Sequence, residues 1–185
     1  MALARSPRLL HNAAMTNEAV DPQWDALWQQ RWDVLNLANI THRYHRKREA
    51  FFDRAEKLTQ AASAMMGLSL LGETVQQHLP IAAAVISGLS LLALVFGYSQ
   101  RRQLHKELAE SACALAGRID GAPLGQLNEA MVRRWQLEMA EINRKEPPNL
   151  MGLVRVCEYE QAVVDGHPDH APAPSWWLRI RSNFF

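Results

Sequence analysis

Two pairs of histidines have a spacing that could bind a metal ion. His42 and His45 are three residues apart in an expected helix, so both imidazoles would lie on one face. His167 and His170 flank a proline and an aspartate in a proline-rich loop. Neither pair is completed by a cysteine or a further histidine at the usual zinc spacing. We therefore expect no metal ion and no cofactor, and the first pair is expected to face solvent or lipid headgroups.

The sequence also carries no signature of catalysis. Cys113 and Cys157 are too few for a disulfide framework and are expected to be small buried apolar residues. The sequence has no glycine-rich phosphate loop, no Gly-x-Ser-x-Gly motif and no pair of carboxylates in a recognisable setting. We therefore expect a protein that is not an enzyme.

Charge and composition exclude two further classes. The 185 residues include 20 Lys and Arg against 19 Asp and Glu, a net charge of +1, and 48% are apolar. A disordered segment would have fewer apolar residues, and a nucleic-acid-binding protein usually has a clear excess of positive charge. We therefore expect no nucleic acid among the partners.

The apolar residues are concentrated in two stretches near the middle of the chain. Residues 80–98 are 19 positions without a charged or amide side chain. As a helix they would be about 28 Å long, close to the ~30 Å hydrocarbon core of a bilayer. A shorter uncharged stretch at 58–72 is followed by a polar turn. The sequence thus predicts an all-α integral membrane protein, a two-transmembrane helical hairpin with spans at about 58–79 and 80–98. A re-entrant or interfacial segment is the alternative for the first span.

Basic residues flank both predicted spans on the side away from the polar turn. Lys and Arg are enriched on the cytoplasmic side of membrane helices, so both termini are expected in the cytoplasm and the protein in the inner membrane as a multi-pass protein. Contact with anionic lipid headgroups is expected for these residues in preference to nucleic acid. The expected membrane-interface residues are Arg43, Arg46, Lys47, Arg48, Arg101 and Arg102.

Apolar residues at near-heptad spacing continue beyond both spans. Leu104, Leu108, Leu115 and Ile119 follow this spacing, which predicts two helices that pack antiparallel in a cytoplasmic helical bundle. We expect three segments: an N-terminal segment with a Trp-rich helix at 1–38, the two-transmembrane module with cytoplasmic helices at 39–166, and a proline-rich loop with an aromatic and basic tail at 167–185.

Tryptophans are candidates for partner or lipid contact at both ends of the chain. Trp24, Trp28 and Trp32 recur at helical spacing on one face. They are expected to pack against a neighbouring helix or the headgroup layer. Trp176 and Trp177 lie in the basic tail, where they suit a membrane interface or a short packed element.

Small residues inside the spans have the spacing that lets helix backbones approach closely. Ser63 and Gly67 form one such pair, and Ala84 and Gly88 form the other. Pairing within the hairpin is one interpretation, and self-association into a homo-oligomer that lines a pore is the other.

The entry to the first stretch resembles a known family. Tyr44-His45-Arg46-Lys47-Arg48 is followed by Phe51-Phe52-x-Arg54, two close spans and a helical region. This layout resembles the SLATT family, two-transmembrane effector modules associated with bacterial nucleotide-signalling and SLOG-type sensor proteins. The similarity covers about residues 39–166. It implies an effector that opens a pore or perturbs the bilayer when a sensor partner, acting in trans, detects infection.

Three functions are therefore open from the sequence. The first is a pore-forming membrane effector in bacterial conflict or anti-phage signalling. The second is a phage or prophage membrane protein, either holin-like or an anchor. The third is a non-enzymatic membrane scaffold that docks cytoplasmic partners through the face with Trp24, Trp28 and Trp32.

Overall fold

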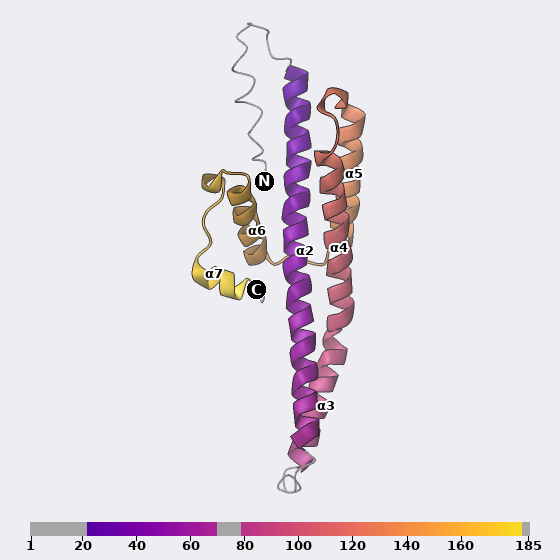
Figure 1. The fold of residues 1–185 in the computed structure, drawn as a ribbon, viewed down its shortest axis with the longest axis vertical. Helices are drawn as coiled ribbons and strands as arrows, with labels where there is room; N and C mark the ends of the chain where they lie inside the picture. Colours follow the sequence, from indigo (N-terminus) through magenta and orange to yellow (C-terminus); the bar gives the residue numbers. More distant parts are fainter. Residues whose placement is uncertain (1–21, 70–78, 183–185) are drawn as a thin grey trace.

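A computed structural model describes residues 22–69 and 79–182 of the chain. All regular structure in these ranges is helical, as predicted, and contains no strand. Figure 1 shows a long helix, α2, with α4 beside it, α5 against α4, and α6 and α7 on the other side. The helices are α2 (Pro22–Ser69), α3 (Leu79–Phe96), α4 (Tyr98–Asp120), α5 (Glu129–Lys145), α6 (Met151–Val164) and α7 (Trp176–Arg181), with short 3₁₀ turns η2 (Leu124–Gln126) and η3 (Pro168–His170).

The long helix α2 forms the axis of the molecule. It contains 48 residues, which corresponds to a length of about 72 Å. Its first turn begins with Pro22, where a missing N–H has no cost, and neither glycine nor proline interrupts residues 23–66. The helix therefore passes without a break from its Trp-rich start through the basic residues into the apolar stretch.

The hydrophobic core lies where α2, α4 and α5 meet. Ala38 of α2 and Ala112 of α4 are fully buried, and their small side chains allow the two helices to pack closely. Leu115 and Ile119 extend this contact, in the antiparallel arrangement that their spacing predicts. The α5 helix contributes a buried stripe along the same core, consisting of Val132, Trp135, Met139 and Ile142.

Two residues between helices, Gly97 and Asn128, mark where one helix ends and another begins. Gly97 has a positive φ of 53° between α3 and α4, a conformation that glycine adopts without steric cost. Asn128 caps α5 by accepting a hydrogen bond from the backbone N–H of Met131 at 3.0 Å. The first of them redirects the apolar helix α3 into the charged helix α4, and the second starts the helix that covers the core.

The structure contradicts the predicted integral membrane protein. Within residues 22–69 and 79–182, no helix is both long enough and apolar enough to cross a bilayer. The first predicted span, at about 58–79, begins as the end of α2 and directly follows the charged Glu56 and Lys57. The second, at about 80–98, is divided at Gly97 and leaves α3 with 18 residues, near the ~17-residue lower limit for a span. This finding also contradicts the predicted two-transmembrane hairpin, the multi-pass inner-membrane location and the pore. The predicted polar turn lies largely outside the described residues.

Candidate functional site

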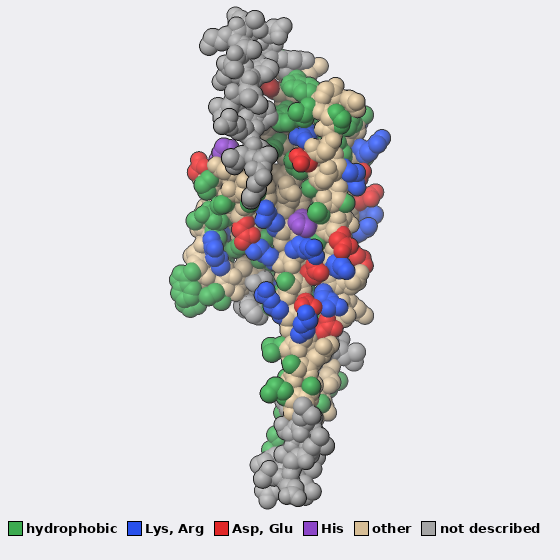
Figure 2. Space-filling model, in the orientation of Figure 1, with side chains coloured by type: hydrophobic (Ala, Val, Ile, Leu, Met, Phe, Trp, Pro, Cys, Tyr) green, Lys and Arg blue, Asp and Glu red, His purple; other side chains and the backbone are tan. Residues whose placement is uncertain are grey.

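One end of the molecule is a narrow extension made of the last turns of α2 and of α3. We call residues 58–65 and 81–95 the arm. None of these residues carries a charged side chain. Figure 2 shows hydrophobic side chains on this extension, below a body on which basic and acidic side chains alternate. Val95 is 76% exposed and Leu58 is 73% exposed, values unusual for large apolar residues.

The exposed residues of the arm follow a heptad pattern. Ile81, Ala84, Gly88, Leu91 and Val95 are separated by alternating steps of three and four, so they share one face of α3, which we call the α3 stripe. All but the half-buried Gly88 are exposed. The last turns of α2 repeat the spacing with the exposed residues Leu58, Ala61 and Met65. Each helix of the arm therefore presents an apolar face to solvent.

The small residues Ala84 and Gly88 of α3 do not contact α2 within the arm. A Cβ added at Gly88 would have no neighbouring atom within 4 Å, and Ala84 is exposed. Both residues therefore face away from α2. Ser63 is half-buried, and the surroundings of Gly67 lie outside the described residues. Of the two interpretations of the Ala84 and Gly88 pair, the structure does not have the one in which they pack α3 on α2.

Three basic residues that were expected at a membrane surface instead contact neighbouring side chains. The Arg43 Nε–H donates a hydrogen bond to Gln161 Oε1 at 2.8 Å. Lys47 Nζ lies 2.9 Å from Glu160 Oε1, and Arg46 pairs with Glu49 on its own helix. The first two contacts join α2 to α6.

The other predicted interface residues lie nearer the arm. The Arg102 guanidinium is 3.0 Å from Asp53 Oδ1, so it links α4 to α2. The half-buried Arg48 lies over the ring of Phe52 at 4.6 Å, and burial lowers its pKa. Arg101 is exposed on α4. The contacts of the basic run explain its position without a lipid surface.

The five tryptophans expected to contact a partner or lipid occupy different environments. Trp28 packs against the core and carries the Arg31 guanidinium 4.9 Å above its ring. Trp24 and Trp32 flank it on α2 and are each nearly two-fifths exposed. Trp176 and Trp177 stack with a centroid distance of 4.0 Å and are both exposed on α7. Of these five, only Trp28 therefore packs against the core, beside the buried Trp135 of α5.

A buried polar network joins three elements near the middle of α2, and no pattern in the sequence predicted it. The Nδ1 atoms of His45 on α2 and His105 on α4 are 2.8 Å apart. His45 Nε2 is 2.9 Å from Glu146 Oε1, in the connection between α5 and α6. Tyr44 accepts a hydrogen bond from the backbone N–H of Leu150 at 3.1 Å. His42 is not part of this group, since its Nδ1 donates to the carbonyl of Ala109 on α4. The predicted pair of His42 and His45 is thus divided between two contacts.

The electrostatics of the network define which atoms carry protons. Burial opposes ionisation of Glu146, but hydrogen bonds from His45 and Asn149 outweigh it, so the pKa of the carboxyl is lowered. Burial and then the neighbouring His45 lower the pKa of His105 to about 4. An ionised carboxylate only accepts hydrogen bonds, so His45 Nε2–H donates to Glu146. One proton lies between the Nδ1 atoms of His45 and His105. This arrangement satisfies each contact.

Burial gives the network a structural role. His45 is fully buried and His105 is 3% exposed, so neither ring presents an edge to a substrate. A hollow of about 360 Å³ lies on the neighbouring surface between α2 and α6, lined by Asn39, His42, Arg43, Arg46, Lys47 and Glu160. The hollow is open and polar, and two of its three cations, Arg43 and Lys47, contact α6. The network and the contacts of Arg43 and Lys47 together hold α6 and its preceding connection against α2.

The chain is thus an elongated all-helical protein with a charged body and an apolar arm. Comparison with protein-family models, curated proteins and solved structures finds no match. The resemblance to the SLATT family therefore stays a prediction from the sequence.

Proposed function

We propose that this protein is a non-enzymatic scaffold that self-associates through the arm and presents its helical body to partner proteins. The observation that carries this proposal is the α3 stripe, an apolar heptad face with no partner among the described residues. The pore-forming effector and the phage membrane protein both need helices that cross a bilayer, so neither is proposed.

The physical argument starts from the free energy of exposed apolar surface. Burying a large aliphatic side chain contributes roughly 1.5–3 kcal/mol relative to leaving it in water. The arm exposes six such side chains: Leu58, Met65, Ile81, Val85, Leu91 and Val95. A contiguous apolar surface of this kind marks an interaction site in most water-exposed proteins.

The pattern of the arm favours a second copy of the chain as the occupant. Both helices carry the same alternating spacing of three and four, so two arms can pack as a four-helix bundle around a two-fold axis. No charge within the arm has to be desolvated, and none selects a partner of opposite charge. Gly88, at the centre of the α3 stripe, allows two backbones to approach closely.

The body of the molecule supplies the surface for other proteins. Its surface carries charges of both signs, unlike the uncharged arm. Trp24 and Trp32 remain exposed at the other end of α2, and exposed tryptophans are frequent energetic anchors of protein interfaces. Two copies joined by their arms would carry two such surfaces in one assembly.

Sedimentation of the purified full-length chain tests this proposal. The wild-type protein should sediment as a dimer or larger oligomer. Leu91→Glu places a charge in the α3 stripe and should weaken association by about 2–3 kcal/mol, or roughly 30- to 150-fold in Kd. Ser90→Glu is the matched control, because Ser90 is exposed on another face of the same helix.

Two results would contradict the proposal. One is a wild-type chain that stays monomeric at concentrations well above those used for the variants. The other is an equal loss of association in Leu91→Glu and Ser90→Glu, which would assign the effect to added charge instead of the stripe. Circular dichroism of each variant shows whether the helices are retained.

A further inference from the structure

The end of α6 is followed by two consecutive tight turns that hold a pair of histidines. Gly166 has a positive φ of 82°, and the N–H of His167 donates to the carbonyl of Ala162 at 2.8 Å. This is the hydrogen-bond pattern in which a left-handed glycine ends a helix. The N–H of His170 then donates to the carbonyl of His167 at 3.0 Å, closing the 3₁₀ turn η3.

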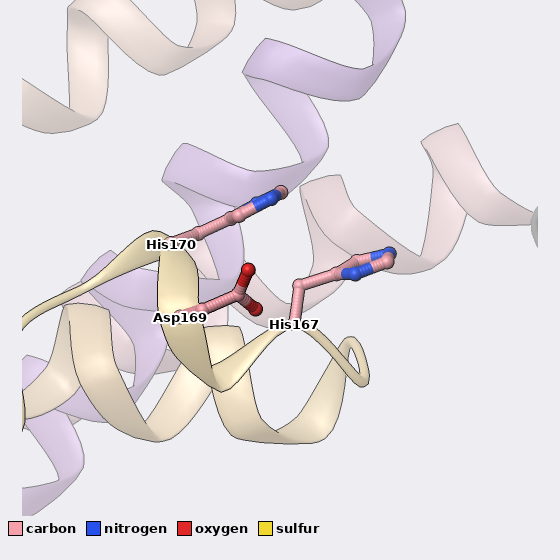
Figure 3. Close-up of side chains that lie close together, drawn as sticks. All are labelled: His167, Asp169 and His170. Carbon is pink, nitrogen blue, oxygen red and sulfur yellow. The ribbon is translucent and has the colours of Figure 1, made fainter.

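The 3₁₀ geometry brings the two imidazoles together. A 3₁₀ helix has three residues per turn, so side chains at positions i and i+3 lie one above the other. The rings of His167 and His170 accordingly stack, with centroids 4.9 Å apart and planes within 13°. Figure 3 shows the side chains of His167, Asp169 and His170 leaving the turn toward the same side.

From this geometry we infer that His167, Asp169 and His170 form a binding site for a divalent transition-metal ion of the zinc type. One ligand atom from each residue can be chosen so that all three lie within 4.8 Å of one another. Zinc bonds of about 2.0–2.1 Å place neighbouring ligand atoms about 3.3 Å apart in a tetrahedral site. The three side chains are exposed, so rotation of the rings supplies the remaining ~1.5 Å without disturbing packing.

The ligand set selects the class of ion. Two imidazole nitrogens and one carboxylate oxygen suit zinc, copper, nickel and cobalt, whereas calcium and magnesium prefer sites made of oxygen alone. Three ligands from one turn leave a fourth coordination position open. Water or a side chain of a partner protein would occupy that position.

The sequence predicted no metal here because it shows spacing and not conformation. In an α-helix, ligands at i and i+3 need further residues from another element to complete a site. The positive φ at Gly166 and the 3₁₀ turn instead bring the aspartate and both histidines onto one side. The site therefore depends on the conformation of one glycine.

Isothermal titration of zinc chloride into the full-length chain, free of any affinity tag, tests the inference. We expect one ion per chain with micromolar affinity, and cobalt should give a visible absorption band from the same site. His167→Ala and His170→Ala should each weaken binding at least about tenfold, the loss typical even of residues that only support a ligand. Asp169→Asn should weaken it by less, because an amide oxygen is still available.

The matched control is Cys113→Ser, since Cys113 is an exposed thiol and the strongest alternative ligand for zinc. This variant should bind like the wild-type chain. The inference is overturned if the wild-type chain takes up no zinc at micromolar concentration, if either histidine variant binds normally, or if Cys113→Ser removes binding. Each variant changes an exposed side chain, so loss of the fold, followed by circular dichroism, is not expected to confuse the result.

Discussion

The Nδ1 atoms of His45 and His105 lie 2.8 Å apart, although the two residues are 60 positions apart in sequence. The contact joins α2 to α4, and Glu146 continues it to the connection between α5 and α6. A buried polar chain of this kind is stabilising only while each member is satisfied. It therefore makes the body sensitive to protonation and to single substitutions.

The first prediction is that the protein loses stability between about pH 6.5 and pH 4. The pKa of His105 is lowered to about 4 in the folded chain, whereas an unfolded histidine titrates near 6.5. Between about pH 6.5 and pH 4 the histidine is protonated in the unfolded chain but neutral in the folded chain. The free energy of unfolding therefore decreases as the pH is lowered through this range, by up to about 3 kcal/mol. Urea unfolding at a series of pH values measures this slope. His105→Gln, which cannot titrate, should flatten it, and an unchanged slope would contradict the assignment.

A second prediction concerns Glu146, whose lowered pKa contributes stability at neutral pH that is lost as pH falls through the folded-state value. Glu146→Gln keeps the size of the side chain but removes the charge. We expect a cost of about 1.5–3 kcal/mol, the range for hydrogen bonds to charged groups. Glu141→Gln on the exposed face of α5 is the control and should change stability by less than about 0.5 kcal/mol. Equal effects of the two substitutions would be incompatible with the network.

Substitution by alanine should change the free energy of unfolding in opposite directions at Gly97, between α3 and α4, and at Gly117, within α4. Gly97→Ala forces an L side chain into the left-handed conformation and should cost about 1–2 kcal/mol. Gly117 lies inside α4, where an added Cβ meets nothing within 4 Å, so Gly117→Ala should stabilise the chain by about 0.5–1 kcal/mol. Thermal unfolding of both variants checks the pair, and the same sign for both would contradict the described hinge between α3 and α4.

The N-terminal tryptophans should separate into a structural and a surface class. Trp28→Ala removes a ring that packs on the core and under Arg31, so it should cost about 2–4 kcal/mol. Trp24→Ala and Trp32→Ala remove mostly exposed rings and should cost much less. If the body docks a partner through this face, the last two variants weaken that contact while retaining the wild-type melting temperature.

The helices of the body could be predicted from the sequence, whereas the role of the arm and the histidine network could not. The leucines and Ile119 of α4 repeat at helical spacing because a helix buries one face. The structure buries Leu108, Leu115 and Ile119 but leaves Leu104, the predicted residue nearest the arm, exposed. For residues 80–96, hydropathy indicates that side chains disfavour water but does not say whether lipid, the same chain or a second chain covers them. The network could not be predicted, because neither His45 nor Glu146 has a local pattern that points to its partner 101 positions away.

Cysteine cross-linking at the centre of the α3 stripe tests the central claim, self-association through the arm, most directly. Gly88→Cys is made in a Cys113→Ser background; the remaining Cys157 is buried, and the chain leaves open space for the new side chain. Position 88 is the middle of the stripe, so it meets its counterpart whether two stripes pair parallel or antiparallel, within the short Cβ separation that a disulfide needs. Mild oxidation should give a covalent dimer with Gly88→Cys and little with Ser90→Cys. Absence of the dimer, or equal amounts from both positions, would contradict self-association through the arm.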